Sequence, residues 1–293
     1  LDGDIAHAII NPVSTIEVKD NSILMGHMYS KEGDWHKPLS RIPDGSFAIY
    51  RSDNELVEIV TDSVGSRAVW YYMDNDLFIA SSSQRAIVLF LENFEFNEKV
   101  IPWMLSTGSL GPNFSWDRRI RRLGPDSSVI LTKKAWVLDS KKVPLNYNEV
   151  KRTFREHKKV LHTSIESTFQ NLNLDLKKWV LPLSGGYDSR SILFFMLKAG
   201  VKSDALNTIT WGLNKSQKEK GNDAYIAKKL AKKVNVNNKY YSTDISGESI
   251  EIVLKRFIEF GEGRIDHLSG YMDGFKIWKT LFEDGVQGII RGD

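Results

Sequence analysis

The chain has 293 residues, of which 41% are hydrophobic and 26% charged, a composition typical of a globular protein with one large or two ordinary domains. Its 40 basic and 37 acidic side chains leave a net charge of +3, too small an excess to indicate a specific nucleic-acid partner. The sequence has no cysteine, which excludes disulfides, thiolate metal sites and a cysteine nucleophile within these residues.

No apolar stretch is long enough to cross a bilayer, and the first residues, LDGDIAHAII, lack the basic segment and apolar run of a signal peptide. We therefore expect no membrane partner and a cytoplasmic location. The chain begins without a methionine and stops directly after a strand-like apolar run, so we also expect it to be a fragment.

Short alternating apolar segments separated by turn residues dominate residues 1–148, which predicts an antiparallel, mostly β domain. Asp53-Asn54 and Asp74-Asn75 lie where hairpin turns are expected, and one helix is expected at about residues 100–106. The predicted strands cover residues 23–25, 47–50, 56–60, 68–72, 77–81 and 128–131.

The basic run RRIRR at residues 118–122 has two interpretations. It could be a nucleic-acid patch, or it could be the exposed side of a strand. Alternation of the arginines with Ile120 and Leu123 favours the strand.

Residues 149–293 alternate helices with strands, which predicts a second domain built on a parallel sheet. The polar stretch 146–149 marks the linker, and a helix is expected from about 151 to 170. Its buried stripe is predicted to consist of Phe154, Val160, Leu161, Ile165 and Phe169. Further strands are expected at 205–211, 239–241 and 287–290, and further helices at 223–234, 248–260 and 268–282.

The segment WVLPLSGGYDSRSILFFMLKAG, residues 179–200, organises this half. Its apolar run 180–183 predicts a buried strand that ends in a tight turn at the two glycines. Asp188 and Ser189 are expected to cap the following helix, and Gly200 to end it. Adjacent glycines and a helix N-terminus let backbone N–H groups face an anion, so the turn is a candidate phosphate site.

The heptapeptide SGGYDSR, residues 184–190, resembles the SGGxDS loop of the PP-loop ATP pyrophosphatases, which cleave ATP to AMP and pyrophosphate. The resemblance implies ATP and Mg²⁺ as cofactors, with Asp188 as the metal ligand and with Asp188 and Ser184 as the catalytic residues. The resemblance places Trp211 beside the adenine ring of ATP, but a position in the hydrophobic core is an equally good interpretation of this residue. The implied ATP-binding residues are Ser184, Gly185, Gly186, Tyr187, Asp188, Ser189, Trp211, Arg291 and Gly292.

Four segments of the first half resemble, in order and approximate spacing, the amidotransferase half of the asparagine synthetase family. They are DGSFAIYRSD (44–53), TDSVGSRAVWYY (61–72), FIASSSQRAI (78–87) and IRRLGPDSSVIL (120–131). The resemblance implies an α/β chain in which residues 1–148 form a degenerate Ntn-type, amidotransferase-like, β-rich sandwich domain. Residues 149–293 would form an asparagine synthetase-like PP-loop ATP-binding domain, truncated at its C-terminus and therefore incomplete.

In active members of that family an N-terminal cysteine attacks glutamine and an Asn-Gly pair stabilises the oxyanion. Here no cysteine is present, and Met25-Gly26 stands where the Asn-Gly pair is expected. The stretch between Tyr29 and Asp44 is also shorter than the family's glutamine-binding segment. We therefore predict that the first half does not hydrolyse glutamine, and leave open whether a cysteine precedes Leu1.

The family resemblance implies an ATP-dependent carbon–nitrogen ligase that activates a carboxylate as an acyl-adenylate for attack by an amine. The amine would be ammonia, or an amine of the same substrate that gives a lactam or macrolactam, as in the cysteine-lacking β-lactam synthetases and lasso peptide cyclases. The expected partners are a small-molecule or peptide carboxylate substrate, and a homodimer mate or a partner chain or segment that supplies the rest of the site.

Two alternatives remain beside the ligase: a nucleotide-binding scaffold or regulatory subunit, and another PP-loop chemistry such as tRNA modification. By resemblance, the neighbourhood of residues 259–266 faces the substrate, with a surface loop as the alternative. The specificity candidates there are Glu259, Glu262, Arg264 and Asp266.

Overall fold

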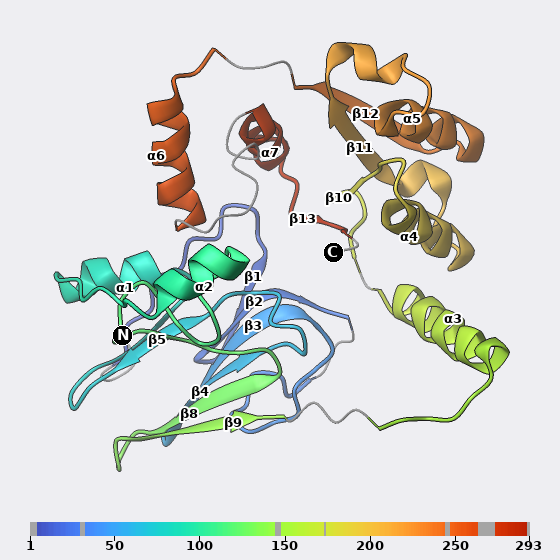
Figure 1. Cartoon of the computed structure of the whole chain (residues 1–293). Coiled ribbons are helices and arrows are strands. Elements are labelled where there is room, and N and C mark those ends of the chain that lie inside the picture. The colour runs from blue at the N-terminus through green and yellow to red at the C-terminus, as the bar shows by residue number, and fades with distance from the viewer. Residues whose placement is uncertain are drawn as a thin grey trace. The chain divides into compact units, whose positions relative to one another are not determined.

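The computed structural model describes residues 5–29, 33–143, 148–172, 174–243, 247–262 and 273–291. The chain divides into two compact units, shown with their elements in Figure 1. The first unit comprises residues 1–147 together with 255–266, and the second comprises residues 148–254 together with 267–293.

A six-stranded antiparallel sheet forms the centre of the first unit. Its strands follow the order β1-β2-β3-β4-β8-β9. The β3–β4 hairpin turns at Asp53, whose carboxylate oxygen Oδ1 accepts the N–H groups of Glu55 and Leu56. The hairpin predicted at Asp53-Asn54 is therefore confirmed. The strands are β1 (Ile16–Lys19), β2 (Ser22–Met28), β3 (Gly45–Ser52), β4 (Leu56–Thr61), β8 (Ser127–Thr132) and β9 (Val137–Lys142).

A second, three-stranded antiparallel sheet packs on one face of the first, which makes a sandwich. It has the order β6-β5-β7, from β5 (Trp70–Met73), β6 (Phe78–Ser81) and β7 (Arg121–Arg122). Ala48 and Val57 of the large sheet share one apolar cluster with Tyr71 and Met73 of the small one. The prediction of a mostly β, antiparallel first half is confirmed.

Two helices cover the other face of the three-stranded sheet (Figure 1). They are α1 (Gln84–Leu91) and α2 (Val100–Thr107), and Ile87, Val100 and Met104 pack with Trp70 of β5. The sequence predicted α2 but not α1. Ser83 caps α1 by accepting the N–H of Ala86, a local signal that the serine-rich segment before it obscured.

The remaining face of the six-stranded sheet is covered by the segment 33–42, which Arg51 holds in place. Trp35 lies in the apolar cluster on that face. The fully buried guanidinium of Arg51 donates to the carbonyls of Trp35, Ser40 and Arg41 at 2.6, 3.0 and 3.1 Å. Glu58 neutralises the guanidinium, since its Oε2 lies 3.2 Å from the Nη1 of Arg51. One buried cation thus fixes a loop that has no regular secondary structure.

The second unit is built on a four-stranded parallel sheet of order β12-β11-β10-β13. Helices α4 and α5 cover one face through the cluster around Leu181, and α7 covers the other through Ile277 and Leu281 (Figure 1). The predicted parallel sheet is confirmed. The strands are β10 (Trp179–Pro182), β11 (Asn207–Gly212), β12 (Asn237–Ser242) and β13 (Gly288–Ile289), and the helices α4 (Tyr187–Lys198), α5 (Asp223–Val234) and α7 (Asp273–Glu283).

The predicted buried stripe of the first helix of this unit is wrong in part. Helix α3 (Phe154–Gln170) contacts α4 through its later turns, where Phe169 stacks on Phe195 at 6.1 Å. Its earlier turns extend past that contact, so Phe154, Val160 and Leu161 are exposed. The helix also starts later than predicted because Thr153 is an extended N-cap that forms a capping box with Glu156.

The remaining elements are two short 3₁₀ helices, η1 (Ser203–Ala205) and η2 (Asn214–Gln217), and helix α6 (Ile250–Gly261). Helix α6 starts in the second unit and ends in the first. None of the helices described here is long and apolar enough to cross a membrane.

Candidate functional site

The candidate site lies where β10 ends and α4 begins. Leu183, which follows β10, is fully buried, and its N–H donates to the carbonyl of Ile209 on β11 at 2.8 Å. The hydroxyl of Thr210 donates to the carbonyl of Leu183 at 2.7 Å. Hydrogen bonds to β11 therefore fix the position of Leu183, the residue directly before the turn at residues 184–186.

Two serine hydroxyls close this turn. The N–H of Ser184 donates to the Oγ of Ser189 at 3.1 Å, and the two Oγ atoms lie 3.0 Å apart. The N–H of Gly186 donates to the Oγ of Ser184 at 3.0 Å. The predicted phosphate ligands Ser184, Gly186 and Ser189 are thus brought together in one hydrogen-bonded loop.

The start of α4 differs from the prediction. Gly186 is the N-cap and has no side chain to offer, while Asp188 is exposed in the first turn and Ser189 bonds back to Ser184. Neither Asp188 nor Ser189 is the cap, which corrects the sequence-based assignment. A helix start without a side-chain cap leaves backbone N–H groups directed out of the helix, where an anion could accept them.

The end of α4 agrees with the prediction for Gly200. Its φ of 93° lies in the left-handed region. The N–H of Gly200 donates to the carbonyl of Leu197 and that of Val201 to the carbonyl of Met196, both at 3.1 Å. This pair of bonds is a Schellman motif, which ends the helix.

Gly185 brings the turn against the N-terminus of α5. A Cβ at Gly185 would lie 2.5 Å from the Oδ1 of Asp223, so no larger residue fits without movement of α5 or its side chain. Asp223 is the first residue of α5, and Asn222 caps that helix. Asp223 is not among the site residues predicted from the sequence. Its only local signal is the Asn222 cap after Gly221, which predicts a helix start but not its proximity to the turn.

Two carboxylates therefore flank the turn, Asp188 on α4 and Asp223 on α5. Mg²⁺ takes oxygen ligands, often one or two carboxylates with phosphate oxygens and waters, so this donor set fits magnesium. Within the described part of the chain, no group of three or more His, Cys, Asp or Glu side chains is placed to hold a metal ion.

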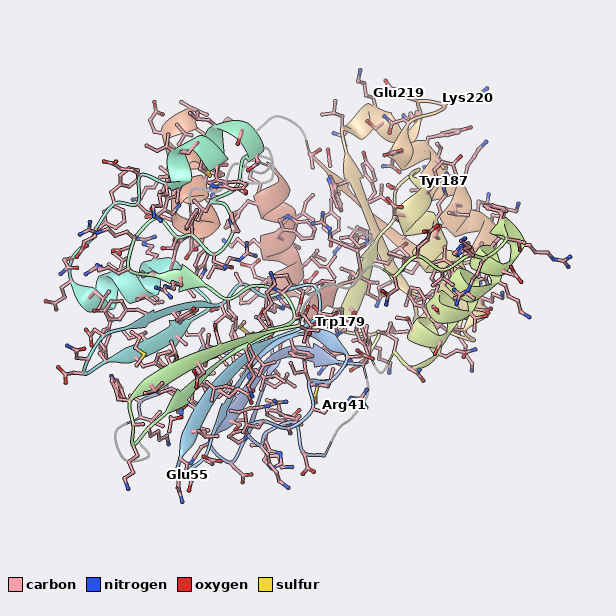
Figure 2. The ribbon with its side chains drawn as sticks, turned by 60° about the horizontal axis from the view of Figure 1, so that its bottom comes forward. Arg41, Glu55, Trp179, Tyr187, Glu219 and Lys220 are labelled. Carbon is pink, nitrogen blue, oxygen red and sulfur yellow. The ribbon has the colours of Figure 1, made fainter. Side chains whose placement is uncertain are left out.

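Tyr187 projects from the turn and is 82% exposed. The guanidinium of Arg190 lies over its ring at 4.7 Å from the centroid, and the Nε of Arg190 donates to the carbonyl of Gly186 at 3.0 Å. Figure 2 labels Tyr187 at the start of α4 and Trp179 at the start of β10. Arg190 thus braces the turn from the solvent side and adds a positive charge beside it.

The other predicted nucleotide residues lie at the same edge of the sheet. Trp211 is the penultimate residue of β11 and is 41% exposed, and its ring meets that of Trp278 on α7 edge to face, with centroids 5.5 Å apart. Arg291 follows β13 and is exposed, whereas Gly292 lies outside the described residues. The strand order reverses between β10 and β13, and ligands of open parallel sheets bind at such reversals.

Glu262, one of the predicted specificity candidates, is hydrogen-bonded to residues of the first unit. Its carboxylate accepts the hydroxyl of Ser83 at 2.5 Å and the Nε2 of Gln84 at 3.2 Å, and its carbonyl accepts the indole N–H of Trp116 at 2.7 Å. These bonds tie it to the start of α1 within the first unit. Glu259 is half-buried on α6, and Arg264 and Asp266 lie outside the described residues.

Met25 packs where the amidotransferase resemblance expects an asparagine. Its half-buried side chain contacts the cluster that contains Ala48 and Val57, and a thioether has no N–H to donate. Gly26 has a φ of 119°, and a Cβ there would clash with the carbonyl of Ser46. The strand thus keeps the glycine of the expected pair without the donor.

No protein-family model and no curated protein matches the sequence. Among the solved structures that match, two have 11% sequence identity to this chain. One is the glutamine phosphoribosylpyrophosphate amidotransferase from B. subtilis complexed with ADP and GMP, with a TM-score of 0.23 over 68% of this chain and 32% of that chain. The other is an allosteric regulatory enzyme of purine biosynthesis, with a TM-score of 0.24 over 71% of this chain and 34% of that chain.

The chain therefore spans about a third of the length of each of these structures. TM-scores this low do not establish a shared fold or a shared activity. What stands is a mixed α/β protein with an antiparallel sandwich in one unit and a parallel sheet in the other. The resemblance to the asparagine synthetase family stays a prediction.

Proposed function

We propose that the second unit binds ATP and Mg²⁺ at the turn 184–189 and that the chain belongs to an ATP-dependent, AMP-forming amide synthetase. The observation that carries the proposal is the turn itself. The SGGYDS segment follows β10, a parallel strand next to the point where the strand order reverses. Its two serine hydroxyl oxygens lie 3.0 Å apart, and the helix that starts there has no side-chain cap.

The residues of the turn have distinct roles in this proposal. The hydroxyls of Ser184 and Ser189 donate to pyrophosphate oxygens, together with backbone N–H groups at Gly185, Gly186 and Tyr187. Asp188 holds Mg²⁺, which neutralises phosphate charge when bound. Trp211, Arg291 and Gly292 flank the adenine.

The proposed reaction needs no protein nucleophile. A substrate carboxylate attacks the α-phosphorus of ATP, and pyrophosphate leaves with the bonding electron pair. An amine then attacks the acyl-adenylate carbonyl, AMP leaves, and the amine loses a proton. The products are an amide, AMP and pyrophosphate. The substrate is a small-molecule or peptide carboxylate, and the amine is ammonia or belongs to the same substrate.

The first unit takes no part in glutamine hydrolysis in this proposal, because Met25 cannot donate to an oxyanion and no cysteine is present in the 293 residues. A homodimer mate, or another chain or segment, supplies further groups of the site.

The direct test is the nucleotide product. Incubation with Mg²⁺, ATP and candidate substrates should release AMP and pyrophosphate. Mass spectrometry should show, in equal amount, a product whose mass is that of the joined substrates less one water. ADP as the product would reject the proposal.

A binding test does not depend on knowing the substrate. Asp188→Ala should weaken Mg²⁺-dependent ATP binding by about tenfold or more, the effect of losing a charged contact of about 1.5–3 kcal/mol. Asp204→Ala removes an exposed aspartate elsewhere in the same unit and should leave the affinity unchanged. Equal affinities for the wild type and Asp188→Ala would contradict the assignment.

A further inference from the structure

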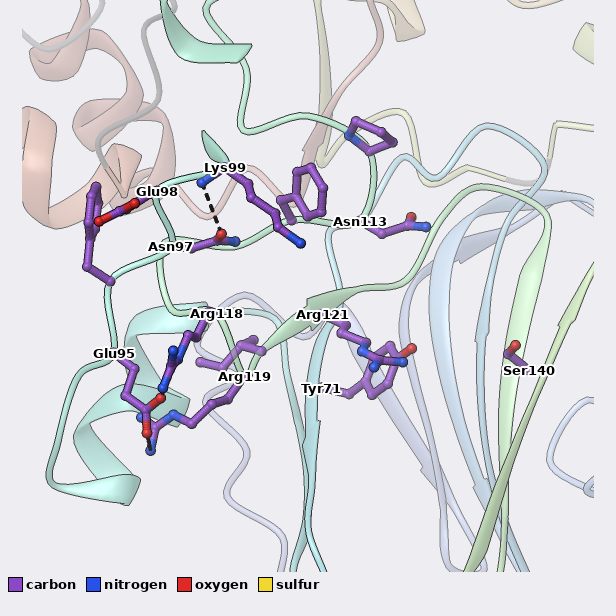
Figure 3. Close-up of a pocket in the computed structure, with 14 residues that line it drawn as sticks. Tyr71, Glu95, Asn97, Glu98, Lys99, Asn113, Arg118, Arg119, Arg121 and Ser140 are labelled. Carbon is purple, nitrogen blue, oxygen red and sulfur yellow. Dashed lines mark hydrogen bonds and ion pairs between the residues drawn. The ribbon is translucent and has the colours of Figure 1, made fainter. Parts of the chain in front are cut away.

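A second candidate site lies in the first unit. It is a pocket of about 1250 Å³ (Figure 3). Its walls come from the segments 95–99, 112–114 and 118–121, from Tyr71 on β5 and from Ser140 on β9. The volume exceeds the range of about 300–1000 Å³ of small-molecule pockets, so it can admit a ligand of peptide size.

The floor of this pocket is held by buried polar groups. Asp117 is fully buried and binds Arg119 through two hydrogen bonds, Nε to Oδ1 at 2.9 Å and Nη2 to Oδ2 at 2.7 Å. The side-chain amide of Asn97 donates to the carbonyl of the fully buried Ser115 at 2.9 Å. The pocket is therefore preformed and does not need a ligand to shape it.

Its charges are only partly compensated. Arg118 forms an ion pair with Glu95 at 2.6 Å, and Arg119 forms an ion pair with Asp117. Lys99 and Arg121 also line the pocket, and neither pairs with a carboxylate of the described residues.

The direction of these side chains fits an anion. Figure 3 shows Lys99 and Arg121 among the residues that line the pocket, and the Glu98 carboxylate points away from the Lys99 ammonium. Two cations that pair with no carboxylate of the described residues thus line the same pocket.

Aromatic side chains lie beside these cations. Tyr71 and Arg121 are cross-strand partners of β5 and β7, which places both side chains on the same face of the sheet. Phe96 is 46% exposed, and Phe114 is half-buried on the opposite loop. The pocket thus combines free positive charge with apolar surface.

We propose that this pocket binds an acidic peptide segment in which carboxylate side chains neighbour an aromatic or aliphatic one. A guanidinium such as that of Arg121 matches a carboxylate with two parallel hydrogen bonds, and Lys99 adds a second charge. The rings of Phe96 and Phe114 cover the apolar side chain of the peptide.

A nucleic-acid ligand fits less well. Nucleic acids carry regularly spaced phosphates and require several uncompensated cations along their path. Glu95 and Glu98 line the same pocket and would repel a continuous phosphate backbone. Spaced carboxylates on a peptide can avoid them. The proposal is independent of ATP binding, since every residue it uses belongs to the first unit.

The test is isothermal titration calorimetry of the whole chain with the blocked peptide Gly-Asp-Phe-Glu-Phe-Gly. We expect saturable one-to-one binding that weakens as ionic strength rises above about 0.1 M, where charge screening becomes strong over about 10 Å. The amide version, Gly-Asn-Phe-Gln-Phe-Gly, should bind about tenfold or more weakly.

Substitutions locate the binding. Lys99→Ser and Arg121→Ser should each weaken the acidic peptide by about tenfold. Both positions are exposed, so the fold should persist, which thermal unfolding checks. Lys134→Ser removes an exposed lysine that does not line the pocket and should leave the affinity unchanged.

Three results would overturn the proposal. The first is no saturable heat of binding with the acidic peptide at up to roughly millimolar concentration, where the binding free energy is only about 4 kcal/mol. The second is a loss of peptide affinity in Lys134→Ser equal to that in the pocket variants, and the third is that Arg121→Ser weakens the binding of single-stranded oligothymidylate in a competition experiment but not that of the peptide.

Discussion

The hydroxyl oxygens of Ser184 and Ser189 lie 3.0 Å apart at the two ends of the turn between β10 and α4. The Ser189 oxygen also accepts the N–H of Ser184, so one side chain holds the turn closed. A phosphate group bound here would replace a bond between two protein hydroxyls by bonds to its own oxygens. The proposed phosphate site therefore has its two hydroxyl groups held close together by hydrogen bonds within the turn.

Replacing Ser189 by alanine should loosen this turn. We expect a loss of stability of about 1 kcal/mol, the typical net worth of one hydrogen bond, and a fall in ATP affinity of several-fold. Urea denaturation and nucleotide titration measure the two effects separately. Ser191→Ala, on an exposed position of α4, is the matched control and should change neither.

Gly185→Ala should be more damaging than its size suggests, because the new methyl group would lie 2.5 Å from the Oδ1 of Asp223. We expect a destabilisation of about 1–3 kcal/mol from overpacking. The double variant Gly185→Ala/Asp223→Ala should recover part of this loss, since it removes the clashing atom. Strict additivity of the two changes would show that the contact does not exist in solution.

Arg51 and Glu58 should be the most sensitive pair in the first unit. Their side chains are 0% and 5% exposed, so replacing either one leaves an uncompensated buried charge. Arg51→Met or Glu58→Gln should cost about 3–5 kcal/mol. Hydrogen exchange should show lost protection in the segment 33–42, where Arg51 bonds three carbonyls, before it does so in the second unit.

The stability of the first unit should depend on the ionisation of Asp117. Burial raises its pKa, but hydrogen bonds from Arg119 and from the N–H of Glu95 lower it, and the result lies below the ordinary value. A lowered pKa means that ionised Asp117 stabilises the fold above the unfolded-state pKa of about 3.9. This stabilisation is lost as pH falls through the lower, folded-state pKa.

The measurement is a pair of denaturant titrations across pH. Asp117→Asn should be less stable than the wild type at neutral pH, and the difference should narrow only below about pH 4. A difference that does not change with pH would mean that charge on Asp117 contributes nothing.

Glu262→Ala distinguishes an anchoring role from a substrate-facing role. Loss of the bonds from Ser83 and Gln84 should destabilise the first unit by about 1–2 kcal/mol. ATP affinity of the second unit should not change. A change in substrate preference at unchanged stability would instead support the sequence-based interpretation of Glu262 as a specificity residue.

Much of the fold could be predicted from local pattern. The hairpin at Asp53 and the glycine end of α4 at Gly200 follow from turn chemistry that acts over a few residues. The limits of α5 were predicted without error, because Asn222 caps it and its alanines recur on one face. These features need no knowledge of the rest of the chain.

The errors arise where distant segments decide the outcome. The apolar residues at the start of α3 have helical spacing, but α4 reaches only the later turns, so Phe154 stays exposed. At the candidate site, the turn 184–186 was evident from sequence. The approach of Asp223 was not, because parallel pairing of β10 with β11 and the packing of α5 create it. Sequence pattern gives the periodicity of an element but not its partners.

The place of β13 has a consequence for how the protein is made. It is synthesised after β10, β11 and β12, yet it pairs with β10, the first of these strands in the chain. Until then one edge of β10 exposes unpaired amides and carbonyls, which other strands can join. We therefore expect nascent or shortened chains that end before Gly288 to depend on chaperones and to aggregate, although the turn after β10 has already been synthesised.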